Sequence, residues 1–261
     1  MVLAHDDVGS GSPVVLLVHA FPLDRRMWRR QVDALVGASR RVIAADLQGF
    51  GASPGRNASE PTSPTSIDDH ADDLVELLTA RRVETAVVVG LSMGGYVALA
   101  FARRHPGKLA GLLLADTKAG PDNPEAKKGR DANIERTHRE GVPAVFEAMR
   151  AKVFTEATAH DHIEELRALA AAQSPGGVAS ALAMMRDRPD ATPALQEIRV
   201  PTTVVVGSAD GATPPSEAQI MAHAIAGAKL VTIEGAGHFT NVERPDEFNR
   251  ALLDLVASVR V

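Results

Sequence analysis

The sequence predicts an α/β fold in which a mostly parallel sheet is flanked by helices and interrupted by an inserted helical cap. Three observations lead to this fold class. Short apolar runs alternate with segments of helical periodicity up to residue 116, the alternation resumes after Pro201, and no strand-like run lies between them. Apolar strands alternating with helices are typical of parallel sheets. We therefore expect a core domain of residues 1–116 and 198–261 and a helical cap of residues 117–197.

The first strand-helix-strand unit follows from two apolar runs. The runs are Val14 to Val18 and Val42 to Ala45, and each has the composition of a strand that is buried on both faces. Between them, apolar residues recur at helical spacing. These are Met27, Trp28, Val32, Leu35 and Val36. The pattern predicts a crossover helix between two parallel strands.

A predicted loop and a predicted helix cap separate the elements that follow. Residues 49–66 are rich in Gly, Pro, Ser and Thr and predict a long surface loop, after which Ser66 is expected to cap a helix with Asp68 and Asp69 in its first turn. The apolar face of that helix is Ile67, Ala71, Leu74 and Leu78. Later strands are predicted at Val87 to Val89, Leu109 to Leu114, Val204 to Val206 and Leu230 to Ile233, with a last helix from about Pro245.

Composition excludes several classes of protein. With 261 residues, 45% of them hydrophobic, the chain can bury a sizeable core, and a net charge of -5 gives no basic face for nucleic acid. There is no cysteine, so disulfides and thiolate sites are excluded, and no apolar stretch is long enough to span a membrane. His160 and His162 flank Asp161, but such a cluster is more typical of a solvated helix end than of a metal site. We expect a cytoplasmic protein with no metal, nucleic-acid or membrane partner.

The clearest chemical signal is Gly90-Leu91-Ser92-Met93-Gly94. A β-branched run enters it and an Ala-rich helical segment leaves it, so Ser92 is expected on a sharp strand-to-helix turn. Glycines two residues before and two after allow the close approach that such a turn needs. Ser92 is therefore the candidate nucleophile, and the N–H of Met93 is a candidate donor to an oxyanion.

A second stretch fits the same pattern but not the same role. Ser53 lies in Gly51-Ala52-Ser53-Pro54-Gly55, with no strand before it and no helical pattern after it. The residue after the nucleophile must donate its backbone N–H, and Pro54 has none. Ser53 is therefore not expected to be catalytic.

A serine nucleophile needs a histidine base and a carboxylate that orients it. Of the nine histidines, only His19 and His238 directly follow strand-like runs, and His238 stands on a Gly-rich turn that would display it; His19 is expected to fix its own loop by hydrogen bonds. Asp210, Asp116 and Glu234 compete as the acid. The chain order serine, acid, histidine favours Asp210.

The second oxyanion donor is expected from the loop after an early strand, where His19-Ala20-Phe21-Pro22 stands, and the N–H of Phe21 is the candidate. Five blocks in order then resemble the α/β-hydrolase superfamily, and within it 3-oxoadipate enol-lactonase-like proteins and small carboxylesterases. The blocks are His19 to Asp24, Asp46 to Ser53, Gly90 to Gly95, Val206 to Asp210 and Gly237-His238. The chain departs from many members at Ala20, where Gly is common, and at Gln48, where Arg is common.

The resemblance and the candidate triad together predict a serine hydrolase of small carboxylic esters or lactones that works through an acyl-enzyme, with no cofactor. Two alternatives stay open: cofactor-free haloperoxidase or perhydrolase chemistry on the same triad, and a ligand-binding receptor. The candidate substrate contacts are Phe21, Met93, Phe146, Met185 and Phe239. The cap residues among them could equally fill the core of the cap.

Overall fold

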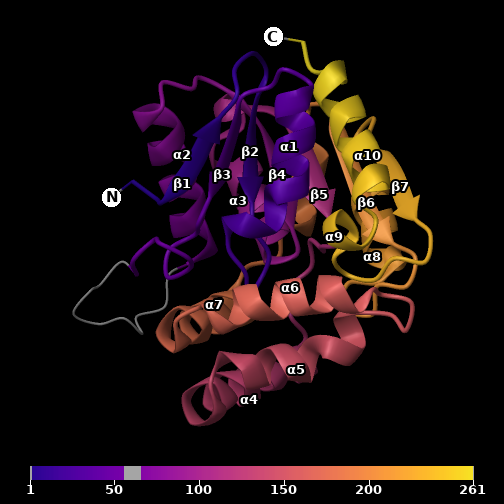
Figure 1. Ribbon diagram of the computed structural model, residues 1–261. Helices are drawn as coiled ribbons and strands as arrows, with labels where there is room; N and C mark the ends of the chain where they lie inside the picture. Colours follow the sequence, from indigo (N-terminus) through magenta and orange to yellow (C-terminus); the bar gives the residue numbers. More distant parts are fainter. Residues whose placement is uncertain (1, 56–65, 261) are drawn as a thin grey trace.

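The centre of the computed structural model, which describes residues 2–55 and 66–260, is a seven-stranded sheet with the strand order β1-β3-β2-β4-β5-β6-β7 (Figure 1). The strands are β1 His5–Val8, β2 Val14–Val18, β3 Val42–Ala45, β4 Ala86–Leu91, β5 Leu109–Ala115, β6 Thr202–Gly207 and β7 Lys229–Ile233. β1 pairs antiparallel with β3, and the other neighbouring pairs are parallel. The predicted α/β-hydrolase fold with a mostly parallel sheet is confirmed.

Helices cover the sheet because its central strands are apolar on both faces. Every residue of β3, β4 and β6 is buried. The helices that pack on or beside the sheet are α1 Arg29–Gly37, α2 Ile67–Ala80, α3 Met93–Arg104, α8 Pro215–Ala224, α9 Thr240–Glu243 and α10 Pro245–Ser258. The rings of Trp28 and Phe248, 6.0 Å apart, join the start of α1 to α10. Both ends of the chain therefore contribute to one core.

Four further helices gather at one end of the sheet (Figure 1). They are α4 Pro124–Glu140, α5 Val142–Val153, α6 His160–Ala171 and α7 Pro175–Asp187. The chain enters this group after β5 and returns to the neighbouring strand β6, so the group is inserted between two adjacent strands. The predicted helical content of residues 117–197 is present; the division into a core domain and a cap at these residues stays a prediction.

Local expectations agree with the structure in most places. Ser66 caps α2 in a reciprocal capping box with Asp69, and the predicted apolar face of α2 is buried. Residues 56–65 of the predicted loop lie outside the described residues. Within the described helices, none combines the length and the apolarity needed to cross a membrane.

Two local features differ from expectation. β1 was not predicted, because its four residues His5 to Val8 alternate between half-buried and exposed positions and carry two carboxylates. Arg41 offsets the negative charge of Asp7 in this edge strand, because two of its guanidinium nitrogens donate to the Asp7 carboxylate at 2.9 and 2.8 Å. Val36, expected on the apolar stripe of α1, is 39% exposed and lies next to the last residue of that helix.

Candidate active site

Ser92 lies at the turn between β4 and α3, at the carboxyl end of the central strand. Its backbone has φ 54° and ψ -113°, a conformation that non-glycine residues seldom adopt. Two hydrogen bonds hold this strained turn: the Ser92 N–H donates to the Ala115 carbonyl at 2.9 Å, and the Thr117 hydroxyl donates to the Ser92 carbonyl at 2.8 Å. The strand beside β4 therefore fixes the position of the serine.

The glycines around Ser92 are required by contact. A Cβ on Gly90 would lie 2.2 Å from the Gly94 carbonyl oxygen, and a Cβ on Gly94 would lie 2.1 Å from the Val18 carbonyl oxygen. Both distances are far below a van der Waals contact. The turn can therefore approach β2 only because these positions carry no side chain.

His238 lies within hydrogen-bond distance of Ser92. Its Nε2 is 2.8 Å from the Ser92 Oγ, and its Nδ1 is 2.8 Å from the Asp210 Oδ2. A carboxylate only accepts, so the Nδ1 carries the proton and the Nε2 is left as the acceptor for the serine hydroxyl. The three side chains thus lie in the order that a proton transfer from serine to imidazole requires.

Asp210 is held by donors on both oxygens. The N–H groups of Ala212 and Thr213 donate to Oδ1 at 2.8 and 3.0 Å, and the Thr213 hydroxyl donates to Oδ2 at 2.7 Å. Burial alone would raise the pKa of Asp210, but the His238 imidazole and these hydrogen bonds outweigh burial and leave that pKa below its usual value. The carboxylate is therefore ionised and oriented toward the imidazole.

The two candidate oxyanion donors come from different loops. Met93 is the first residue of α3, where backbone N–H groups have no partner inside the helix. Phe21 follows β2 in a turn closed by the Leu23 N–H, which donates to the Ala20 carbonyl at 2.9 Å. Neither the Met93 N–H nor the Phe21 N–H donates to an acceptor within residues 2–55 and 66–260. Both are available to a developing negative charge.

The residues that competed for these roles have structural contacts. The Ser53 hydroxyl donates to the Asp46 carbonyl and accepts from the Ala4 N–H, each at 2.8 Å. The Nε2 of His19 accepts from the Leu47 N–H at 3.0 Å, and its Nδ1 is 3.0 Å from the Ala20 carbonyl. His19 therefore fixes its own loop by hydrogen bonds, as expected from the sequence, and the Ser53 hydroxyl joins its loop to Asp46 and Ala4.

In the described part of the chain, neither Asp116 nor Glu234 forms a hydrogen bond to the His238 ring, which contacts Asp210 and Ser92. Asp116 is fully buried, accepts from the Gly207 N–H at 3.0 Å and contacts the Thr240 hydroxyl. Burial, followed by the negative charge of Asp210, raises the pKa of Asp116 well above its usual value. Asp116 therefore joins the ends of β5 and β6 to the loop after His238, and Glu234 is exposed.

The loop that carries His238 is fastened to the inserted helices. The Glu243 carboxylate accepts from the N–H groups of Gly237 and Phe239, both at 3.2 Å, and from the Thr158 hydroxyl at 2.6 Å. The His238 N–H donates to the Val153 carbonyl at 2.8 Å. The end of α5 thus helps to fix the imidazole.

The five predicted substrate contacts are all buried. They are Phe21, Met93, Phe146, Met185 and Phe239. The Phe239 ring packs edge-on against His238 at 5.4 Å and lies 5.5 Å from Phe154, whose ring is 6.0 Å from Phe146. None of the five lines the two cavities that follow, so their role as substrate contacts stays a prediction.

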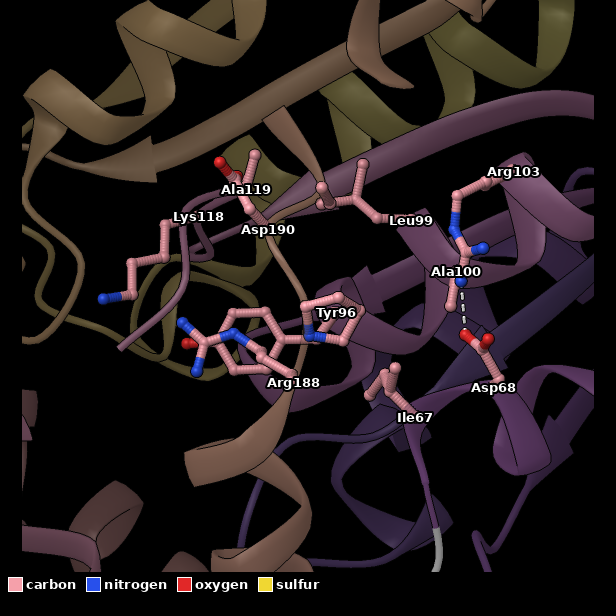
Figure 2. A pocket seen from close by; sticks show the side chains of 12 residues that line it. Ile67, Asp68, Tyr96, Leu99, Ala100, Arg103, Lys118, Ala119, Arg188 and Asp190 are labelled. Carbon is pink, nitrogen blue, oxygen red and sulfur yellow. Dashed lines mark hydrogen bonds and ion pairs between the residues drawn. The ribbon is translucent and has the colours of Figure 1, made fainter. Parts of the chain in front are cut away.

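Two cavities open beside α3, and both are lined by Tyr96 and Lys118. One, of about 570 Å³, is also lined by Val153 and Ala212; the Val153 carbonyl accepts from the His238 N–H, and the Ala212 N–H donates to the Asp210 carboxylate. The other, of about 330 Å³, is lined by apolar side chains such as Leu99 and by charged ones, and the Arg188 guanidinium lies over the Tyr96 ring (Figure 2). Tyr96 is one helical turn after Ser92, so both cavities border the nucleophile's helix.

Met149 and Leu182, which line the larger cavity, were among the residues that the sequence offered as pocket or core residues, whereas Thr213, Glu243 and the charged residues Lys118, Arg130 and Arg188 were not identified as site residues. Thr213 follows Asp210 by three residues, a spacing that an Asp side chain commonly bridges, and could have been noticed. Nothing local distinguishes Glu243. In the described part of the chain, no group of three or more His, Cys, Asp or Glu is arranged to hold a metal ion, and His160 lies 4.0 Å from Glu164 on an exposed helix face.

Comparisons with known proteins show which structures share this fold. An esterase from Thermogutta terrifontis, solved with malate bound, superposes with a TM-score of 0.92 at 41% identity over 99% of this chain and 94% of its own. A bromoperoxidase from Bacillus anthracis superposes with a TM-score of 0.84 at 25% identity over 97% of this chain and 95% of its own.

Sequence comparison gives the same family. The 3-oxoadipate enol-lactonase 2 of Acinetobacter baylyi is 28% identical over 92% of this chain and 87% of its own length. The model of the alpha/beta hydrolase family matches residues 15–251. The match extends from β2 into α10 and includes all the strands that support Ser92, Asp210 and His238. The chain therefore belongs to the alpha/beta hydrolase family.

Proposed function

We propose that this protein is a serine hydrolase of small carboxylic esters or lactones and that it works through an acyl-enzyme. One observation carries the proposal: the unbroken line of hydrogen bonds from Ser92 through His238 to Asp210, each step 2.8 Å long. Similarity to an esterase and to an enol-lactonase supports the substrate class. The strained backbone of Ser92 supports a functional role, because such strain persists where the surroundings enforce it.

The proposed reaction has two halves. The Ser92 Oγ attacks the carbonyl carbon as its proton passes to the His238 Nε2, and the carbonyl oxygen takes the negative charge beside the N–H groups of Met93 and Phe21. The tetrahedral intermediate then collapses, and the protonated imidazole gives its proton to the leaving alkoxide. Water repeats the sequence on the acyl-enzyme, releasing the acid and restoring Ser92. Asp210 stays ionised and stabilises the imidazolium.

A second candidate, perhydrolysis, would use the same acyl-enzyme with hydrogen peroxide in place of water, and the similarity to a bromoperoxidase favours considering it. Release of a peracid from an ester in the presence of peroxide distinguishes the two. A receptor that only binds its ligand would show no turnover of either kind.

The test of the proposal is the Ser92→Ala variant with Ser53→Ala as its matched control. Removal of the nucleophile should lower the rate of p-nitrophenyl acetate hydrolysis by about a million-fold. Loss of the Ser53 hydroxyl should lower the stability of the fold and leave the rate of turnover unchanged. An organophosphonate should add its mass to Ser92 in the wild type, as measured by peptide mass spectrometry. Equal loss of turnover in the two variants, or labelling elsewhere, would contradict the proposal.

A further inference from the structure

The charges that line the two cavities are unbalanced around one carboxylate, Asp122. The Arg188 Nη1 lies 2.8 Å from its Oδ1, the Lys118 Nζ lies 3.5 Å from the same oxygen, and the Arg130 Nε lies 3.0 Å from its Oδ2. Burial alone would raise the pKa of Asp122, but the charges of Arg130 and Arg188 hold that pKa below its usual value. One ionised carboxylate therefore faces three cations.

The buried Arg188 by itself requires the negative charge of Asp122. Its side chain is 3% exposed, its guanidinium stacks on the Tyr96 ring at 4.1 Å, and its other nitrogen contacts are the carbonyls of Met185 and Gly120 at 2.6 and 2.8 Å. A buried guanidinium needs a charged partner to offset the loss of its hydration. Asp122 is thus the counter-ion that the fold requires for Arg188.

The positive charges of Lys118 and Arg130 then exceed the negative charge of the single Asp122 carboxylate. Their side chains are 20% and 22% exposed, and neither has another carboxylate partner in the described part of the chain. Of the other acidic residues along the walls of the two cavities, Glu125 extends into solvent, Asp68 pairs with Arg103 and Arg104, and Asp190 accepts from the Thr192 N–H. These two positive charges, together with that of the exposed Lys152, therefore line a partly enclosed space in which water screens Lys118 and Arg130 less than at an open surface.

The position of these charges connects them with the reaction. Lys118 and Arg130 both line the cavity of about 570 Å³ that also contacts Val153 and Ala212, next to His238 and Asp210. Lys118 directly follows Thr117, whose hydroxyl holds the Ser92 carbonyl. Figure 2 shows the Lys118 side chain extending beside the Arg188 guanidinium and the Tyr96 ring.

We propose that Lys118 and Arg130 form a binding site for a carboxylate on the substrate, so that the preferred ester or lactone carries a free acid group remote from the bond that is cleaved. The inference rests on the proposed function and names its substrate class. An Arg guanidinium and a Lys ammonium can both donate to one carboxylate in charge-assisted hydrogen bonds. The incoming carboxylate would relieve the repulsion between the two cations.

The test compares p-nitrophenyl half-esters of glutarate, adipate and pimelate with the same compounds methylated at the remote carboxylate, by p-nitrophenol release. The three chain lengths sample different distances between the two groups. We expect at least one half-ester to have a kcat/KM about 10-fold above that of its methylated form, mainly through a lower KM, and this preference to fall as salt is raised.

Lys118→Met and Arg130→Gln should each reduce that preference about 10-fold. Lys128→Met is the matched control, because it removes the same charge from an exposed site in α4 that lines neither cavity. Its preference should equal that of the wild type. Equal kcat/KM for half-esters and methylated esters at every length, or equal effects of the Lys118 and Lys128 variants, would overturn the proposal.

Binding to the Ser92→Ala variant separates this inference from the proposed function. Calorimetry should detect salt-sensitive binding of adipate to Ser92→Ala and weaker binding to the double variant with Lys118→Met. Such binding without turnover of any ester would support the carboxylate site and reject the hydrolase. Turnover of neutral esters with no preference and no adipate binding would reject the carboxylate site and support the hydrolase. Inorganic phosphate and succinate are then compared as competitors of adipate binding. Equally strong competition by the two would contradict a carboxylate-selective site.

Discussion

Replacement of Asp210 by Asn tests the acid of the proposed triad. The side-chain oxygen of Asn can still accept from the N–H groups of Ala212 and Thr213, which now donate to Oδ1 at 2.8 and 3.0 Å. Its NH₂ group would stand where Oδ2 accepts from His238. The imidazole must then accept at Nδ1 and carry its proton on Nε2, facing the Ser92 hydroxyl. That tautomer cannot take the serine proton.

The expected loss is about 10⁴ in kcat, the size seen when the same change is made in a comparable triad, or about 5 kcal/mol of transition-state stabilisation. The measurement is kcat and KM for p-nitrophenyl acetate, with urea unfolding to confirm that the variant is folded. Asp116→Asn is the control. Asp116, like Asp210, follows the carboxyl end of a strand, but it contacts Gly207 and Thr240 instead of His238. The assignment would be refuted by an Asp210 variant that retains activity within about 10-fold of the wild type, or by an Asp116 variant that loses as much.

Two further predictions concern stability. The pKa of Asp116 is raised in the folded state from an ordinary value of 3.8, so above that value the unfolded chain loses its proton first and the free energy of unfolding falls as pH rises. Between about pH 4 and about pH 7 this fall should be smaller in Asp116→Asn, as measured by urea unfolding, and identical slopes would contradict a protonated Asp116. Gly90→Ala places a Cβ 2.2 Å from the Gly94 carbonyl oxygen and should destabilise the protein by about 3 kcal/mol, whereas Gly107→Ala, with no atom within 4 Å of its Cβ, should have little effect. Equal melting temperatures of the two glycine variants would show that the turn at Ser92 can relax.

Features that depend on short stretches of sequence were predictable. The apolar runs of β2, β3 and β4 bury both faces, and an entirely apolar strand is stable only inside a sheet that is covered on both sides. The strand, turn and helix around Ser92 follow from a β-branched run, two glycines and an Ala-rich segment, all within a few residues. Pro54 excluded Ser53 by its missing N–H alone. These conclusions needed no knowledge of what lies far away in the chain.

Contacts between distant segments were decided by the tertiary structure. Asp116 and Asp210 both follow strands that are neighbours in the sheet, and only the loop path turns one side chain toward His238 and buries the other against Thr240. The hydrogen bond from the Thr158 hydroxyl to the Glu243 carboxylate joins two segments that are far apart in the sequence. Likewise, the cations around Asp122 come from three segments of the inserted region, and their excess charge exists only after folding. Periodicity and turn chemistry act over a few residues, whereas the electrostatics of a site depends on which groups packing brings within about 4 Å.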